Sequence, residues 1–196
     1  MFKKIAIVVI CLALIVAGGL AIKKYCFPPQ DVEITEYFMD ITWDMSKRKV
    51  KELLYEKGYI PEPHPLDMLI YEIEDFGGFE GANARMVINY DNENEKMIIL
   101  SFNNEKMSED EVNEFAEACM YKLDSICDKK LELTELLEYG GTVYNKEGKE
   151  GQEYKNMLYF LGESAISIIY YEDEKIMITY GPKDSEYHQM MLQFAE

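Results

Sequence analysis

The chain has 196 residues, enough for one ordinary domain with an appendage, and its 48% hydrophobic and 13% aromatic residues can fill a core. Lys and Arg number 20 against 37 Asp and Glu, a net charge of −17, and the part after residue 24 alone carries −21. Such a body repels nucleic acid and anionic lipid headgroups. We therefore exclude nucleic-acid binding as a general function and expect a protein partner, with a basic one favoured by charge.

The chain begins with an apolar segment, residues 1–24, in which pairs of lysines flank an uncharged run of 18 residues. A helix of this length spans about 27 Å, enough for the hydrocarbon core of a bilayer. We expect a single-pass membrane anchor built on Ile5, Val8, Leu12, Leu14, Ile15, Val16, Leu20 and Ile22. The alternative is a secretory signal that is cleaved after Ala17-Gly18-Gly19 or Gly19-Leu20-Ala21. The charge at the amino terminus slightly exceeds that of Lys23 and Lys24, which places the domain outside the cytoplasm.

Residues 25–33, with Pro28 and Pro29, are expected to form a short stiff linker before an acidic domain at residues 34–196. The first helix is predicted over Lys47–Lys57. Ser46 is its N-cap, Met45 packs on Val50 as a hydrophobic staple, and Gly58 ends it.

The remaining elements alternate between runs of β-branched or aromatic residues and amphipathic helices. Helices are predicted at Ser108–Asp128, at Glu135–Tyr139 and around Tyr187–Phe194. Strands are predicted at Met68–Ile73, Met86–Tyr90, Met97–Phe102, Thr142–Tyr144, Tyr154–Leu161, Ser164–Tyr171 and Lys175–Tyr180. This order indicates an α+β fold, an antiparallel sheet with helices packed on one face.

Two helix starts share one pattern: MSKRKV at residues 45–50 and MSEDEV at residues 107–112. Each has an apolar residue, a Ser cap, three charged residues and a valine, and each precedes strands. Either the domain contains two helix–strand–strand–strand repeats, or any two capped amphipathic helices look alike in this way.

The stretch Trp43-Asp44-Met45-Ser46, followed by Val50, resembles the helix start of small bacterial envelope lipoproteins of the helix-plus-antiparallel-sheet kind. That resemblance implies an envelope protein that acts through protein contacts. It supplies no catalytic residues.

The sequence offers few residues for catalysis or metal binding. His64 and His188 are the two histidines, and neither lies at metal-ligand spacing. His64 lies in a proline-rich loop, where a lone histidine is usually solvated, and His188 begins the C-terminal segment. Gly162-Glu163-Ser164 is better explained as a hairpin turn than as a nucleophile elbow. We therefore expect no catalytic residue, no cofactor and no metal site.

The cysteines do not reveal the redox compartment. Cys119 and Cys127 lie about 12 Å apart on one predicted helix, too far for a disulfide, and are expected to be buried thiols. The state of Cys26 stays open.

The candidate binding residues are Trp43, Lys47, Arg48 and Lys49. The three cations occupy a helix start, where the macrodipole disfavours positive charge by about 0.3–1 kcal/mol each. They either pair with surrounding carboxylates or form a docking patch beside the only tryptophan.

The leading hypothesis is a membrane-anchored, extracytoplasmic protein-binding module without catalytic activity. It could act as an immunity protein that neutralises a secreted toxin at the membrane surface, or as an envelope-assembly factor. A carboxylate-dependent hydrolase is the remaining alternative. The oligomeric state cannot be inferred from the sequence.

Overall fold

The structure is a computed structural model that describes residues 30–64, 68–91, 95–103, 107–133, 136–138, 142–144, 154–171 and 175–194. The chain divides into two units, Met1–Gln30 and Asp31–Glu196. The predicted anchor and linker residues before Gln30 lie outside the described residues. Within the described part, no helix is both long enough and apolar enough to cross a membrane.

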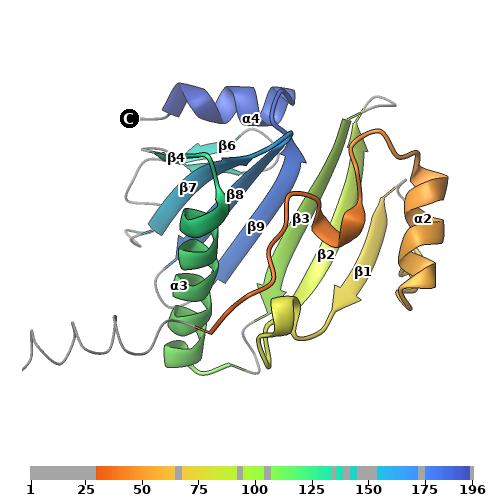
Figure 1. Ribbon diagram of the computed structural model, residues 1–196, viewed down its shortest axis with the longest axis horizontal. Coiled ribbons are helices and arrows are strands. Elements are labelled where there is room, and N and C mark those ends of the chain that lie inside the picture. Colours follow the sequence, from red (N-terminus) through yellow and green to blue (C-terminus); the bar gives the residue numbers. More distant parts are fainter. Residues whose placement is uncertain are drawn as a thin grey trace, which may run out of the picture. The chain divides into compact units, whose positions relative to one another are not determined.

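The second unit is an α+β domain built on a seven-stranded antiparallel sheet (Figure 1). The α+β class and the antiparallel sheet were predicted from the sequence, but the number of strands in the sheet was not. The strand order is β1-β2-β3-β9-β8-β7-β4, and a separate hairpin pairs β5 with β6. The strands are β1 (Leu69–Ile73), β2 (Asn83–Asp91), β3 (Glu95–Asn103), β4 (Lys129–Glu132), β5 (Leu136–Glu138), β6 (Thr142–Tyr144), β7 (Tyr154–Leu161), β8 (Ser164–Tyr171) and β9 (Lys175–Pro182).

The sheet consists of two meanders that meet at its centre. Helix α2 (Lys47–Glu56) precedes β1-β2-β3, and helix α3 (Glu109–Ile126) precedes β4 and the meander β7-β8-β9. The last strands of the two meanders, β3 and β9, pair antiparallel, with Ile98 opposite Tyr180. The helix–strand–strand–strand order is therefore present twice, with β4 and the β5–β6 hairpin added in the second half.

Both predicted helix caps are present. Ser46 Oγ accepts a hydrogen bond from the backbone N–H of Lys49 at 3.4 Å, and Gly58 follows the helix at φ +92°. Ser108 forms a full capping box: its side chain accepts a hydrogen bond from the backbone N–H of Glu111, and the Glu111 carboxylate accepts one from the backbone N–H of Ser108. The first turn of α3 is thus doubly capped, and that of α2 only singly.

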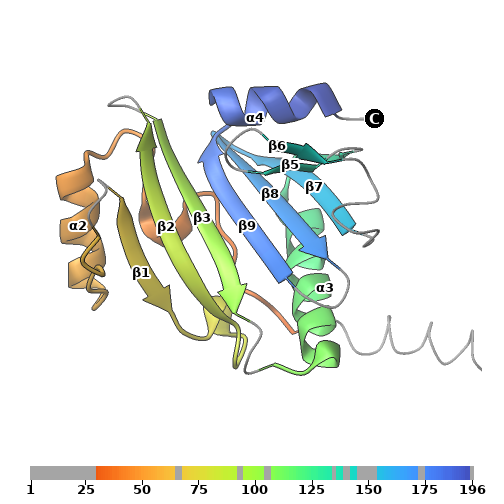
Figure 2. The same ribbon diagram turned by 180° about the vertical axis from the view of Figure 1, so that it is seen from behind.

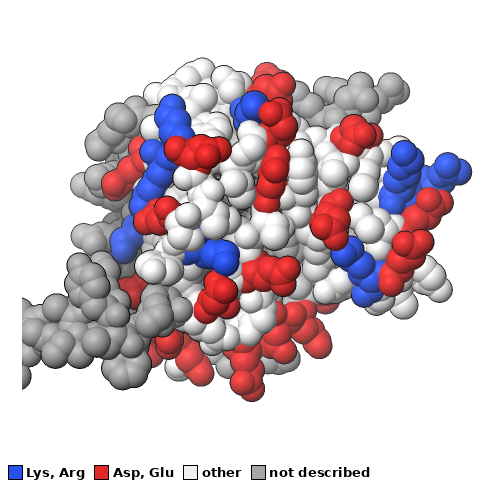
Figure 3. All heavy atoms as spheres, viewed as in Figure 1, with Lys and Arg blue, Asp and Glu red and all other residues white. Residues whose placement is uncertain are grey.

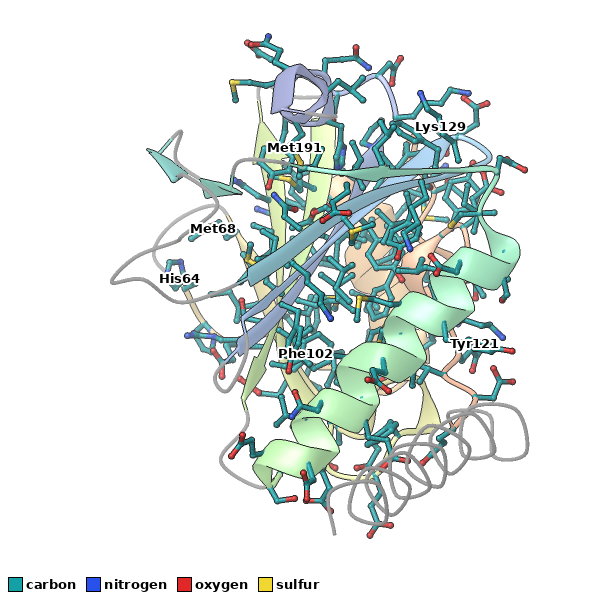
Figure 4. All side chains as sticks on the ribbon, turned by 90° about the vertical axis from the view of Figure 1, so that its left-hand side faces the viewer. His64, Met68, Phe102, Tyr121, Lys129 and Met191 are labelled. Carbon is teal, nitrogen blue, oxygen red and sulfur yellow. The ribbon has the colours of Figure 1, made fainter. Side chains whose placement is uncertain are left out.

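The main core lies between the front face of the sheet, α3 and the N-terminal strap (residues 31–46), which runs across this face (Figure 1). Phe115 of α3 is fully buried, with its ring centroid 4.9 Å from that of Phe102 and 5.1 Å from that of Phe79. The strap contributes four buried side chains: Val32, Ile34, Phe38 and Ile41. Figure 4 shows Phe102 between α3 and the sheet, and Tyr121 pointing outward from α3.

The prediction that all helices pack on one face is wrong for α4 (Glu186–Met191). Met191 points from α4 toward the sheet (Figure 4) and clusters with Leu158 and Ala165. These strand residues alternate with Met157, Tyr159 and Ile166 of the main core, so they lie on the opposite face. Strands β7 and β8 are buried on both sides, and α4 covers the second side.

The short helix predicted at Glu135–Tyr139 is also wrong, because Leu136–Glu138 forms β5 and pairs with β6. One turn of isolated helix is unstable on its own, whereas a hairpin satisfies the backbone groups of both strands. Strand β4 was not predicted. Gly162 and Glu163 do form the β7–β8 hairpin turn, as expected.

Candidate functional site

Trp43 fastens the N-terminal strap to the sheet. Its indole Nε1 donates a hydrogen bond to the Oγ of buried Ser164 at 3.0 Å, and its ring centroid lies 6.0 Å from that of Tyr37. Its backbone carbonyl accepts a hydrogen bond from Nζ of Lys96, a lysine whose pKa is lowered by burial. This half-buried tryptophan therefore has a structural role, whatever else it contacts.

The three predicted cations do not form one patch with Trp43, because consecutive helix residues point about 100° apart. Lys47 lies over the ring of Tyr90 on β2, 5.8 Å from its centroid. Arg48 points outward and makes a loose 3.7 Å ion pair with Glu52. Lys49 is exposed. The pKa of Asp44 is lowered mainly by the hydrogen bond from Thr42 and by a bond to its own backbone, and the charge of Lys49 makes a smaller contribution in the same direction.

The structure reveals a pocket of about 420 Å³ that the sequence did not indicate. It lies between the strap, the end of α2 and the loop that joins β1 to β2. All three non-glycine residues found at positive φ in the described chain contribute to it: Met39 (52°), Asp40 (64°) and Asp75 (46°). Such backbone conformations are uncommon, and they persist only where the surrounding structure holds them.

Hydrogen bonds and close packing fix this backbone. The N–H of Glu33 donates to the carbonyl of Gly77 at 3.0 Å, which ties the strap to the β1–β2 loop. Gly77 is required there, because a Cβ would lie 2.4 Å from Val32 and its φ is +60°. Asp75 Oδ1 accepts a hydrogen bond from the N–H of Gly81 at 2.7 Å. The pocket is a defined part of the fold.

The rim of the pocket is strongly acidic. Its four carboxylates are exposed and come from Glu33, Asp40, Glu74 and Asp75. One lysine, Lys57, faces them, and its Nζ lies 2.8 Å from Oδ2 of Asp40. This hydrogen bond is the main cause that raises the pKa of Lys57. The pocket already holds one ammonium group and keeps three further carboxylates.

Apolar side chains form part of the pocket lining. Phe38, Ile73 and Phe76 are buried, and Met39 and Tyr59 are half-buried. A site that combines apolar side chains with several carboxylates suits an elongated cation, because the aliphatic part contacts the apolar side chains and the charged end reaches a carboxylate. Lysine and arginine side chains have this shape.

No protein-family model, no curated protein and no solved structure matches the chain.

The structure provides no grouping of side chains typical of a hydrolase or a metal enzyme in the described part of the chain. No Asp or Glu is buried among the described side chains, and no three His, Cys, Asp or Glu residues there cluster to hold a metal ion. His64 is exposed, as expected. His188 is fully buried, because α4 packs its ring against Gly181. Burial lowers the pKa of His188 to about 4.

Cys119 in α3 and Cys127, which caps its C-terminus, are free thiols, and the predicted burial is complete only for Cys119. Cys119 is buried and Cys127 is half-buried. Burial raises the pKa of both, that of Cys127 to about 11, so neither is a ready nucleophile. Cys26 lies outside the described residues.

Proposed function

We propose that this chain is a membrane-anchored, extracytoplasmic protein-binding module whose acidic pocket receives a lysine or arginine side chain of a basic partner. The pocket is the observation that carries the proposal. Its volume lies in the range of ligand sites, apolar side chains form part of its lining, and four carboxylates at its rim face a single lysine. The charge of the body, −21 after residue 24, attracts a basic protein from a distance and accelerates association.

The front face of the domain carries further negative charge beside the pocket. Figure 3 shows carboxylates crowded along the lower edge of this face. The first turn of α3 supplies Glu109, Asp110 and Glu111, and Met107 just before it lies beside Gly81 of the β1–β2 loop. A basic partner that enters the pocket therefore meets further acidic surface beside it. The exposed position of the pocket carboxylates favours binding over acid–base catalysis, which uses buried groups with perturbed pKa values.

The test is affinity capture from the native organism with the full-length chain as bait. The pocket variant is Glu33→Gln with Glu74→Gln, two exposed side chains whose loss leaves the described backbone bonds intact. The control is Glu114→Gln with Glu117→Gln, which removes the same charge from the outer face of α3. We expect a basic protein to be captured by wild type and control, released by salt, and lost with the pocket variant. Equal capture by all three baits contradicts the proposal.

Two physiological roles are compatible with a protein-binding module of this kind. An immunity protein would rescue cells from a toxin encoded by a neighbouring gene, and the pocket variant would fail to rescue. An envelope-assembly factor would give envelope stress on deletion and no protection against any toxin. The captured partner and the adjacent genes distinguish the two.

The membrane anchor is part of the proposal and is tested separately. The protein should stay in the membrane fraction when cells are broken without detergent. Protease added to the outside of protoplasts should digest the domain. Recovery of a soluble form that begins near Ile22 would show a cleaved signal instead.

A further inference from the structure

Helix α2 displays a basic and aromatic stripe on its outer face. The helix buries Val50 and Leu54. Arg48, Lys51 and Tyr55 follow at i, i+3 and i+7, so they share one exposed face, centred about 110° around the helix from the buried residues and bordered by Glu52. All three are exposed, Tyr55 by 71%. We name Arg48, Lys51 and Tyr55 the α2 stripe.

Helix stability does not explain the stripe. Four cations against two carboxylates make the helix positive in an acidic protein, and its first turn contains no acid. Helix α3 begins with three acidic residues, the arrangement that the macrodipole favours. Two of the four large hydrophobic side chains found exposed in the described chain, Tyr55 and Ile60, lie on α2 or just after it. Figure 3 shows cations at the right edge of the molecule, where α2 lies, with carboxylates between them.

We propose that the α2 stripe docks an acidic segment of a protein partner, in which carboxylates flank an apolar or aromatic side chain. Arg48 is free to exchange its loose 3.7 Å pair with Glu52, where both side chains are more than half exposed, for a bidentate pair with a partner carboxylate. Lys51 supplies a second charge one turn along. Tyr55 supplies rigid apolar area beside them, the residue type that most often anchors interfaces.

Charge decides between this occupant and two others. An anionic membrane surface would meet the acidic body as well as the stripe, and the net repulsion disfavours it. A second copy of the chain carries −17 itself, so two copies repel each other before the stripe makes contact. The acidic body repels a short acidic segment as well, but the segment carries far less charge than a membrane or a second copy. Screening over about 8 Å at physiological salt leaves the cations of the stripe as its main neighbours. This site is separate from the pocket and takes the opposite charge, so the two proposals stand or fall independently.

The experiment is a selection of peptides on the full-length chain in non-ionic detergent, from a display library of random dodecapeptides. Enriched sequences are synthesised with a fluorescent label, and their affinities are measured by fluorescence anisotropy at low and high salt. We expect net-negative peptides with an apolar or aromatic residue, and binding at least about tenfold weaker in 500 mM than in 50 mM NaCl.

Matched variants locate the binding. Arg48→Gln with Lys51→Gln should weaken it by about tenfold or more, and Tyr55→Ala by about fivefold. The controls Lys129→Gln with Lys155→Gln, and Tyr121→Ala, remove equal charge and another exposed tyrosine ring elsewhere and should not change the affinity. Gln keeps the helix propensity, so folding is preserved.

Three results overturn the proposal. The first is a selection in which no acidic peptide binds more weakly to the stripe variants than to wild type. The second is capture by phosphatidylglycerol vesicles that is lost with the stripe variants, which would assign the stripe to the membrane. The third is stripe-dependent self-association in analytical ultracentrifugation, which would assign it to a second copy. Failure of the pocket variants in the capture experiment above leaves this inference unaffected.

Discussion

Acidification tests how α4 is held on the sheet. His188 is fully buried, and its Nδ1 lies 2.8 Å from Oγ of Ser185 and 3.2 Å from the carbonyl oxygen of Pro182. When Nδ1 carries the proton, it donates a hydrogen bond to the carbonyl oxygen of Pro182. The other ring nitrogen, Nε2, then has no hydrogen-bond partner among the described residues. A second proton on Nε2 would have no acceptor in the described part of the chain. This burial lowers the pKa of His188 from 6.5 to about 4.

The magnitude follows from the two pKa values. Between pH 6.5 and pH 4 the unfolded chain binds a proton at residue 188 that the folded chain does not bind. Stability that is present at neutral pH is therefore lost as the pH falls through this window. Each pH unit lowers the free energy of unfolding by at most about 1.4 kcal/mol, which gives an upper limit of about 3 kcal/mol.

The assay is urea denaturation at pH 7 and at pH 4.5, followed through the fluorescence of Trp43. His188→Gln cannot titrate, so the loss of stability between the two pH values should be about 2 kcal/mol smaller in this variant than in wild type. His64→Gln is the control, since His64 is exposed, and it should behave as wild type. Equal losses in wild type and His188→Gln would refute the reasoning, and would show that α4 is already open in the native protein.

Three further predictions concern single contacts. Lys49→Glu completes a capping box with Ser46, as Glu111 does with Ser108, and should raise the free energy of unfolding by about 0.5–1 kcal/mol in urea denaturation, whereas an unchanged value would show that residue 49 makes no capping box. Trp43→Phe leaves buried Ser164 without its indole donor and should cost about 1–2 kcal/mol; in a double-mutant cycle with Ser164→Ala, additive losses would show that the bond contributes nothing. Phe115→Ala leaves a cavity among three phenylalanine rings and should cost about 3–5 kcal/mol in urea denaturation, whereas a loss below about 1 kcal/mol would place Phe115 outside the core.

Local patterns predicted most of the fold. The seven strands expected from Met68 onward are all present, because each is a run of β-branched and aromatic residues between turn signals. Ser46 and Ser108 marked the helix starts correctly. The errors arose where tertiary pairing decides. The residues of Leu136–Glu138 suit a helix, but this segment pairs with β6. The position of α4 was missed because it packs on the second face of the sheet, against strand residues that alternate with those of the main core. No local sequence pattern shows which helix covers such a face. The duplication of the two halves stays a prediction.

The candidate site was only partly accessible from sequence. The basic start of α2 is visible as consecutive letters, but helical geometry separates Lys47 and Lys49 from Arg48 and places Lys51 and Tyr55 beside Arg48 instead. Grouping the exposed residues of the helix at positions i, i+3 and i+7 would have identified that stripe from the sequence. The pocket combines residues 33–40, 57–59 and 73–78, which become neighbours only after the strap crosses the sheet. The acidic, glycine-rich turn after Ile73 was its single local signal.

The most direct measurement of the central claim is an NMR titration of the ¹⁵N-labelled full-length chain, in non-ionic micelles, with an acetylated and amidated trilysine peptide. The account predicts saturable shifts of the backbone amides of Asp40, Glu74 and Gly77, which lie at the pocket, and their disappearance in the Glu33→Gln, Glu74→Gln variant. Shifts that spread over the acidic surface without saturation, or that persist unchanged in this variant, would contradict it.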